Sequence, residues 1–242
     1  MQKLEQRVLY PFPEVDSVDL NIGILDENDD TALRNRALIE SNGARCINIM
    51  SSPGSGKTTL LERTLSDFHG FPRIAILEGD MTTELDADRL RACGAPTVAI
   101  TTGRSCHLEA NQIAEGLRKL SLEGSLSRFE LFIIENVGNL ICPAAYDLGE
   151  HKRVVLVAVT EGEDKPLKYP IMFHGADCVV ITKLDIAPYL KLDVEKLKSN
   201  IQHVNPTAEI IAVSSESGDG MTTWLDWLRT NCAVPLPSTV SG

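Results

Sequence analysis

The sequence lacks several features, and each absence excludes a class of protein. No apolar run approaches the roughly 20 residues of a membrane-spanning helix, and VVLVAV at 154–159 is typical of the longest. The first 20 residues have neither an apolar core nor a small-residue cleavage site, so we expect no secretory signal peptide. Lys and Arg number 23 against 34 Asp and Glu, and the net charge of −11 disfavours general nucleic-acid binding. We therefore expect a cytoplasmic protein with no membrane and no nucleic acid among its partners.

Cysteine and histidine are also scarce, with six and five residues and no His-rich tract. In a reducing compartment such cysteines are core thiols or metal ligands rather than disulfides. Cys46 and Cys178 lie inside apolar runs, which assigns them to the core. The settings of Cys106 and Cys142 are different and are considered below.

Short runs rich in Val and Ile alternate with helical patterns along most of the chain. These runs show little polar alternation, as is typical of strands covered on both faces. We predict an α/β fold of the P-loop NTPase type, with a doubly wound, mostly parallel sheet. The predicted strands are 46–50, 73–77, 96–100, 129–134, 153–159, 177–182 and 208–213.

The two ends of the chain differ from this pattern. We expect a short helical N-terminal extension over 1–43, in which one helix begins near Leu4–Leu9 and an acidic helix over 24–43 ends at Gly43. The nucleotide-binding domain is predicted over 44–232. The last ten residues, 233–242, are expected to form a flexible tail.

The stretch SSPGSGKTTLL at 51–61 has the context that a phosphate-binding loop requires. A predicted strand leads into it, and a helix follows directly. The glycines bring backbone N–H groups close to phosphate oxygens, Lys57 reaches the β- and γ-phosphates, and the Thr58 hydroxyl suits Mg²⁺. Ser51 stands where the usual pattern has Gly. A Gly-rich turn without a ligand is the alternative. The predicted nucleotide ligands here are Gly54, Ser55, Gly56, Lys57, Thr58 and Thr59.

Two further strand ends supply carboxylates. Asp80 and Glu135 are predicted to hold Mg²⁺, directly or through water, and to share the catalytic work with Lys57. Gly138 follows in E-N-V-G, where its amide would meet the γ-phosphate and act as a switch. For either carboxylate taken alone, a helix cap is the alternative.

The stretch ITKLD suggests which base is bound. An aspartate only accepts hydrogen bonds, so Asp185 matches the two adjacent donors of guanine, and the Lys183 stem would lie along the base. Thr182 stands where most GTPases have Asn. Ser214, Ser215 and Glu216 follow the next strand, where a second base-contacting loop is expected. We predict GTP and GDP as ligands.

Cys106 and His107 are adjacent, and we place them at the start of a helix. Cys142 lies directly behind Gly138. Thiolate and imidazole together favour soft or borderline metals, namely Ni²⁺, Zn²⁺ or copper. Neighbours on a helix point about 100° apart, so one chain would give an incomplete ligand set that a symmetric dimer could complete. A buried thiol beside a helix-terminal histidine is the alternative.

Taken together, these motifs resemble the HypB family of nickel-insertion GTPases in [NiFe]-hydrogenase maturation, over roughly residues 22–230. The resemblance is carried by the phosphate loop and by EGD (78–80), TGRSCHLEA (102–110), ENVGNLICPA (135–144), VTEGEDKPLKYP (159–170) and TKLDIAPY (182–189). It implies a GTP-dependent homodimer of the signal-recognition-particle/MinD class, with Cys106, His107 and Cys142 as the metal ligands at its interface.

The same resemblance implies Mg²⁺ at Asp80 and Glu135 and a guanine contact at Asp185. It places Lys165 and Lys168 near the dimer interface, with roles left open. The implied partners are a HypA-type nickel chaperone and the hydrogenase large subunit. The N-terminal cysteine cluster and the His-rich storage tract of some relatives are missing here, so nickel insertion is expected rather than storage.

Four alternatives remain. A urease-type nickel GTPase would be expected to show Cys-Pro-His where this chain has Ser-Cys-His-Leu at 105–108. A cobalamin-enzyme chaperone would not need the Cys-His pair, an ATP-dependent kinase would have no use for Asp185, and a nucleotide-gated scaffold would dimerise without hydrolysis. We expect GTP to order the segment from Glu135 to Cys142, and hydrolysis to relax it and transfer the metal.

Overall fold

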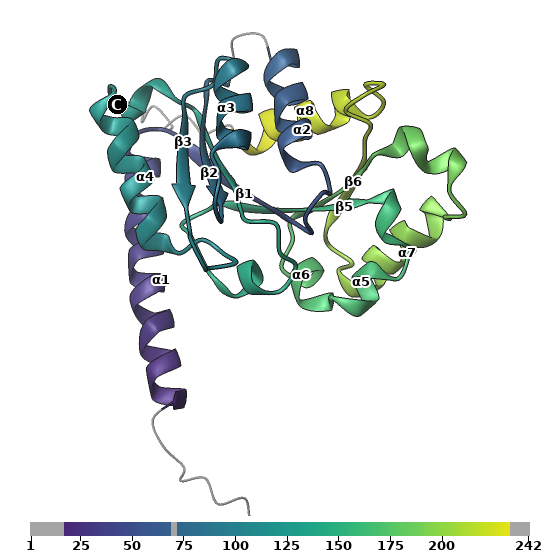
Figure 1. Ribbon diagram of the computed structural model, residues 1–242, viewed down its shortest axis with the longest axis horizontal. Coiled ribbons are helices and arrows are strands. Elements are labelled where there is room, and N and C mark those ends of the chain that lie inside the picture. Colours follow the sequence, from purple (N-terminus) through teal and green to yellow (C-terminus); the bar gives the residue numbers. More distant parts are fainter. Residues whose placement is uncertain (1–16, 69–71, 233–242) are drawn as a thin grey trace, which may run out of the picture.

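A computed structural model describes residues 17–68 and 72–232, and side chains from residue 27 onward. Its centre is a sheet of seven strands in the order β3-β2-β4-β1-β5-β6-β7, in which every neighbouring pair is parallel. The prediction of a doubly wound α/β fold is confirmed (Figure 1). The strands are β1 (Arg45–Ser51), β2 (Ile74–Asp80), β3 (Thr97–Thr101), β4 (Leu131–Glu135), β5 (Lys152–Ala158), β6 (Cys178–Thr182) and β7 (Glu209–Ala212).

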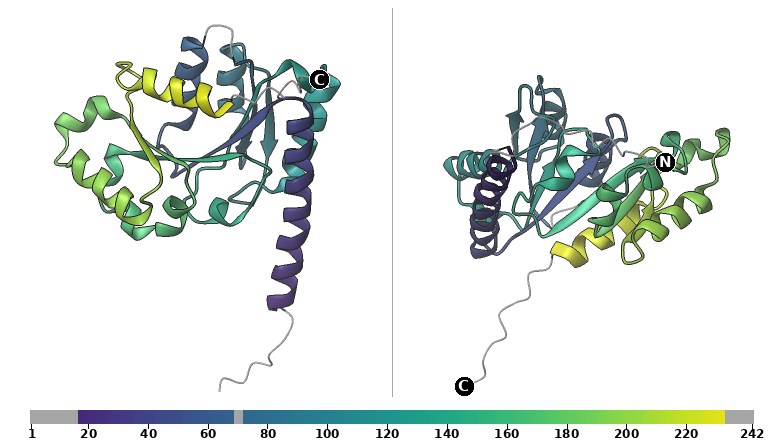
Figure 2. Two further views of the ribbon diagram at one scale, coloured as in Figure 1. Left: turned by 180° about the vertical axis from the view of Figure 1, so that it is seen from behind. Right: turned by 90° about the horizontal axis from the view of Figure 1, so that it is seen from below.

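Helices cover both faces of the sheet (Figures 1 and 2). One face packs against α2 (Lys57–Asp67), α3 (Leu85–Ala92) and α8 (Met221–Cys232). The other packs against α1 (Ser17–Ser41), α4 (Ala110–Leu122), α6 (Pro170–His174) and α7 (Val194–Val204), with α5 (Lys165–Lys168) beside α7. No helix among the described residues is long and apolar enough to cross a membrane.

Burial on both faces explains why the strands are nearly continuous apolar runs. In β5, Val154 and Leu156 enter one core while Val155 and Val157 enter the other. Each fully buried side chain of this size stabilises the fold by about 1.5–3 kcal/mol. The pleat sends successive side chains to opposite faces, so a strand between two helical layers needs apolar residues at every position.

The N-terminal helix α1 is longer than predicted, since it begins at Ser17 and ends at Ser41. The turn after it passes through Gly43, whose φ of 75° favours glycine. Its first turns run beyond the rest of the fold (Figure 2). Two side chains of α1, Asn28 and Asn35, bind the helix to the start of α4 and to residues 147–148. The helix expected near Leu4–Leu9 and the tail 233–242 lie outside the described residues.

The topology gathers the predicted site residues at one edge of the sheet. Ser51, Asp80, Glu135 and Thr182 are the last residues of β1, β2, β4 and β6. Because all strands are parallel, their carboxyl ends meet at the same edge, where open α/β sheets bind ligands.

Candidate nucleotide and metal sites

The phosphate loop lies between β1 and α2. Gly54 and Gly56 have φ values of 74° and 92°, in the left-handed region that favours glycine. Ser55 donates from Oγ to the Ser52 carbonyl at 2.9 Å and closes the turn. The first N–H groups of α2 have no partner within the helix, and with the helix dipole they provide an anion-binding position.

Ser51 occupies the usual glycine position without strain, because as the last residue of β1 it does not adopt a positive φ. Its Oγ donates to the Ser52 carbonyl at 2.7 Å and accepts from Lys57 Nζ at 3.3 Å. The hydroxyl therefore holds the lysine close to the loop.

Two buried carboxylates lie side by side beneath this loop. Glu135 accepts from Thr58 Oγ1 at 2.7 Å, and its register partner on the adjacent strand is Glu78. Burial raises the pKa of Glu135 to about 7, and burial together with the charge of Glu135 raises the pKa of Glu78 to about 8. Sequence reasoning missed Glu78 as a site residue. Its signal was a glutamate inside an otherwise apolar strand, two residues before Asp80.

This arrangement fits Mg²⁺. The Oε2 atoms of Glu78 and Glu135 are buried and accept no hydrogen bond from any described residue. Hard oxygen ligands next to a threonine hydroxyl are what Mg²⁺ prefers. Asp80 lies at the end of the same strand, where the amides of Thr82 and Thr83 each donate to Oδ1 at 2.8 Å. Its partial burial opposes ionisation, but these hydrogen bonds outweigh it and lower its pKa.

The loop after β4 touches the phosphate loop. A Cβ at Gly138 would lie 3.0 Å from Pro53 Cα, so a larger residue would push the two loops apart by a few tenths of an ångström. The buried Asn136 ties this loop to two other segments. Its Oδ1 accepts from Val137 N at 3.0 Å and from Leu108 N at 3.3 Å, and its Nδ2 donates to Asn48 Oδ1 at 3.3 Å.

The residues predicted to read the base lie after β6 and β7. Lys183 adopts a left-handed conformation with φ 60°, and its Nζ donates to the Gly54 carbonyl at 2.7 Å. Asp185 accepts from Ser214 Oγ at 2.6 Å, which brings the two predicted loops together. Thr182 Oγ1 donates to the Ser55 carbonyl at 2.6 Å, so the residue in place of the usual Asn braces the phosphate loop.

Three other predicted nucleotide ligands are exposed or half-buried, and among the described residues no hydrogen bond of their side chains joins them to the phosphate loop or to Asp185. Thr59 is exposed and accepts from Arg89 Nη2 at 3.4 Å. Ser215 is half-buried, and its carbonyl accepts from Arg63. Glu216 is exposed. Their assignment to the nucleotide remains a prediction.

The three predicted metal ligands converge. The Sγ atoms of Cys106 and Cys142 are 2.8 Å apart, His107 Nδ1 is 3.9 Å from Cys106 Sγ, and one donor atom of each residue lies within 4.8 Å of the others. Placing Cys106 and His107 at the start of a helix was wrong, because α4 begins at Ala110. In a loop, adjacent side chains are not held about 100° apart as they are in a helix, so the donor atoms of Cys106 and His107 can both approach Cys142.

Neighbouring contacts hold these donors. Leu108 is buried against Gly79, where a Cβ would be 2.7 Å from the leucine side chain. Asn139 Oδ1 accepts from the Cys142 amide at 3.2 Å. Burial lowers the pKa of His107 against the opposing charge of Glu109, which favours the neutral imidazole that binds metals. The hydrogen bond with Cys106, together with burial, raises the pKa of Cys142.

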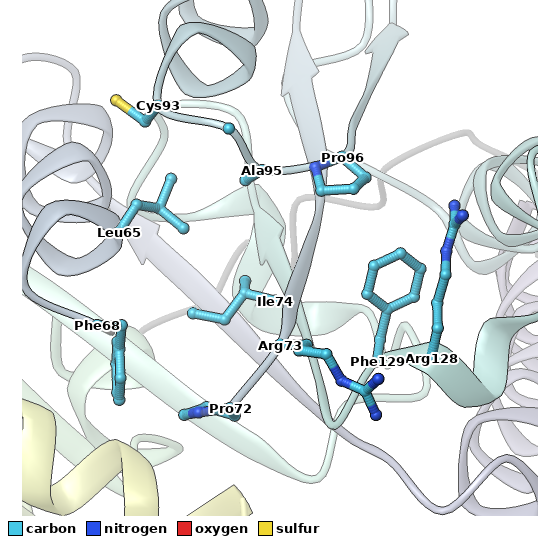
Figure 3. A pocket seen from close by; sticks show the side chains of 11 residues that line it. Leu65, Phe68, Pro72, Arg73, Ile74, Cys93, Ala95, Pro96, Arg128 and Phe129 are labelled. Carbon is cyan, nitrogen blue, oxygen red and sulfur yellow. The ribbon is translucent and has the colours of Figure 1, made fainter. Parts of the chain in front are cut away.

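A cavity of about 470 Å³ lies away from both sites, and it contains none of the predicted ligands (Figure 3). It is lined by residues that precede β2, β3 and β4, such as Arg73, Pro96 and Phe129, at the opposite edge of the sheet. The predicted site residues therefore lie at the carboxyl edge of the sheet and not in this cavity.

Comparisons with known proteins identify the family of this chain. Residues 45–212 match the family model described as "CobW/HypB/UreG, nucleotide-binding domain". The hydrogenase maturation factor HypB of Escherichia coli K12 is 47% identical over 217 residues, which cover 89% of this chain and 73% of that protein. The hydrogenase/urease maturation factor HypB of Helicobacter pylori 26695 is 43% identical over 218 residues, 89% of each chain.

A solved structure is similar throughout the fold. The crystal structure of HypB from Helicobacter pylori in complex with nickel superimposes with a TM-score of 0.81 at 42% identity, covering 85% of this chain and 95% of that one.

Proposed function

The chain belongs to the HypB hydrogenase maturation factors of the CobW/HypB/UreG family, and from that premise we propose that it is a GTPase that delivers nickel during [NiFe]-hydrogenase maturation. GTP hydrolysis to GDP and phosphate would control a nickel site formed by Cys106, His107 and Cys142. One observation carries this proposal: a single buried side chain, Asn136, contacts both the loop of the predicted phosphate sensor and the loop of the metal donors.

The coupling follows from how this side chain is held. Oδ1 of Asn136 accepts from the amides that precede Gly138 and follow His107. If the γ-phosphate draws Gly138 toward the phosphate loop, Asn136 shifts with it and moves the backbone next to His107. Cys142 lies on the same segment, four residues after Gly138. Any change of metal affinity with the nucleotide must be matched by an equal effect of metal on nucleotide affinity.

The nucleotide half works mainly by positioning and charge. Lys57 and the N–H groups of α2 would bind phosphates, and Asp185, oriented by Ser214, would accept the two adjacent donors of guanine. Mg²⁺, bound with the nucleotide, would neutralise phosphate charge. Thr58, Asp80 and Glu135 would hold it, and Glu78 would place a further carboxyl group nearby. Water is the nucleophile, so the protein has only to align it.

A second connection favours a nucleotide-dependent homodimer. Glu161 accepts from Ser55 Oγ at 2.7 Å and from Ala158 N at 2.9 Å, and Lys165 Nζ lies 3.3 Å from its other oxygen. The segment 159–170 is thereby tied to the phosphate loop. Lys168 pairs with Asp164 on the exposed side of this segment. Leu167 within the segment and Ile171 directly after it are exposed apolar residues. Such a surface suits a partner copy.

Nickel is the cargo of this reaction. The similarity to a nickel-bound HypB supports nickel, whereas two thiols and an imidazole also suit zinc. We propose a HypA-type chaperone as the nickel donor, the hydrogenase large subunit as the recipient and the cytoplasm as the location. A second candidate client is urease, because the Helicobacter pylori relative is named for both enzymes.

Calorimetric titration tests the proposal. Ni²⁺ and Zn²⁺ are titrated into the protein with GDP and with a non-hydrolysable GTP analogue, and light scattering follows the mass. We expect a dimer with the analogue and nucleotide-dependent metal binding that Cys106→Ala abolishes. Cys93→Ala, which removes an exposed thiol remote from the site, is the matched control. Metal binding that is identical in both nucleotide states and in Cys106→Ala would refute the proposal.

A further inference from the structure

The two nitrogens of the His107 ring lie in different surroundings. Nδ1 lies on the side of the thiols, 3.9 Å from Cys106 Sγ. It also lies 3.4 Å from Ser105 Oγ, a hydroxyl that donates to the His107 carbonyl at 3.0 Å. Nε2 is buried and has no hydrogen-bond partner among the described residues. The Glu109 carboxylate lies near it, with Oε1 at 3.8 Å. The ring is therefore oriented, but its second nitrogen is not yet paired.

Metal binding would make this second nitrogen important. When one ring nitrogen of a neutral histidine donates its lone pair to a metal, the other carries the hydrogen. A buried N–H without an acceptor is costly, and metal-bound histidines usually donate this hydrogen to a carboxylate or a carbonyl. Glu109 is positioned to accept it after a movement of about an ångström, from 3.8 Å to hydrogen-bond distance.

The surroundings of Glu109 allow this movement. Its backbone N–H donates to Gln112 Oε1 at 2.9 Å, which fixes the main chain at the start of α4 without using the carboxylate. A cavity of about 130 Å³ lies beside it, lined by Glu27, Asn28 and Tyr146 among others. The main chain of Glu109 is therefore fixed, and the adjacent cavity leaves room for its carboxylate to move.

Tyr146 fixes the plane of the ring. It stacks on His107 with ring centroids 4.1 Å apart and an interplanar angle of 23°. It follows the helical turn η2 (Cys142–Ala145), which starts with a metal donor, and it packs against the core under α4. A stacked aromatic pair of this kind restricts rotation of the imidazole.

We propose that Glu109 and Tyr146 are positioning residues for the nickel cargo. Tyr146 holds the plane of His107, and Glu109 accepts its Nε2–H, so that Nδ1 is presented to the metal together with the two thiolates. This inference rests on the proposed function, since it concerns the same metal site.

A double-mutant cycle tests it. Ni²⁺ affinity is measured with bound GDP for wild type, Glu109→Gln, His107→Ala and the double variant. Loss of this kind of partner typically weakens metal affinity 10- to 100-fold, so we expect at least about 10-fold for Glu109→Gln and no additional loss in the His107→Ala background. Glu115→Gln removes an exposed charge from α4, and this control variant should bind Ni²⁺ as the wild type does.

Tyr146 provides a second, independent measurement. Tyr146→Phe keeps the stack and should retain affinity, whereas Tyr146→Leu should lose it. The ¹⁵N NMR signals of His107 with Zn²⁺ should show metal on Nδ1 and hydrogen on Nε2. Thermal melting confirms that each variant is folded.

The outcomes separate the two proposals. If the wild type binds no nickel, or binds it independently of Cys106, the proposed function fails. If binding depends on Cys106 but Glu109→Gln has no effect, or weakens binding equally with and without His107, the positioning role is overturned and the proposed function stands. Metal on Nε2 in the NMR spectrum would also overturn it.

Discussion

Asn136 provides the most incisive test of coupling between the nucleotide and metal sites. Asn136→Ala removes the acceptor of two backbone amides, Val137 N and Leu108 N, and the donor to Asn48. Each buried donor left without a partner costs about 1–3 kcal/mol. We therefore expect the free energy of unfolding to fall by about 3 kcal/mol, with the metal donors themselves intact.

The assay compares nickel affinity with GDP and with a non-hydrolysable GTP analogue. One ligand typically changes the affinity for a second, coupled ligand by about 5- to 150-fold. We therefore expect the two nickel affinities of the wild type to differ by at least about 5-fold. In Asn136→Ala the two affinities should become nearly equal. Asn136→Asp keeps the acceptor for both amides and should retain part of the difference.

Asn205→Ala is the matched control. Asn205 is also buried, and it donates to the carbonyls of Phe173, His174 and Ala176, at the edge of the sheet away from the sites. It should lose comparable stability and keep the full nucleotide effect. An Asn136→Ala protein that is folded and still shows the wild-type affinity ratio would refute the route through this side chain.

Three further predictions concern the separate parts of the site. Asp185→Asn should weaken GTP binding and improve XTP binding, because xanthine offers an acceptor where guanine has its amine; a nucleotide competition assay measures this, and unchanged preference would argue against a base contact. The pKa values of Glu78 and Glu135, about 8 and about 7, lie above the ordinary 4.5, so the Mg²⁺-free protein should lose stability as the pH rises from 4.5 through these values, since the unfolded chain ionises first. Melting curves at several pH values should show this loss, and Glu78→Gln should reduce it; a rise in melting temperature over that range would contradict the assignment. A mild oxidant such as diamide should join Cys106 to Cys142, whose sulfurs are 2.8 Å apart, and abolish nickel binding; peptide mapping by mass spectrometry detects the bond, and oxidised protein that still binds nickel normally would contradict the ligand assignment.

Much of the fold could be predicted from local patterns. The apolar runs located all seven strands, because strands buried on both faces need Val and Ile at nearly every position. A parallel sheet then brings strand ends together, which is why Asp80, Glu135 and Asp185 could be assigned to one edge. The phosphate loop could be predicted from its spacing together with the strand before it and the helix after it.

What could not be predicted depends on register and on loop conformation. Glu78 lies beside Glu135 because of the pairing between β2 and β4, which no local pattern reveals. Residues 106 and 107 looked helical because α4 follows closely, and its start at Ala110 is set by Glu109 and Gln112 rather than by a Ser, Thr, Asp or Asn cap. Tyr146 and Asn136 contact residues that are distant in the sequence. Such contacts depend on the tertiary fold and cannot be recognised from the pattern of a single sequence.

We propose that GTP hydrolysis lowers the affinity of the protein for nickel. A single-turnover experiment tests this most directly. Protein loaded with Ni²⁺ and GTP is followed by the thiolate-to-nickel absorption band and by a fluorescent phosphate sensor in the same mixture, with a metal chelator present as acceptor. We predict that the band decays with the rate of phosphate release, and that it persists when the non-hydrolysable analogue replaces GTP. A band that stays constant through a complete turnover, or decays equally with the analogue, would contradict the account.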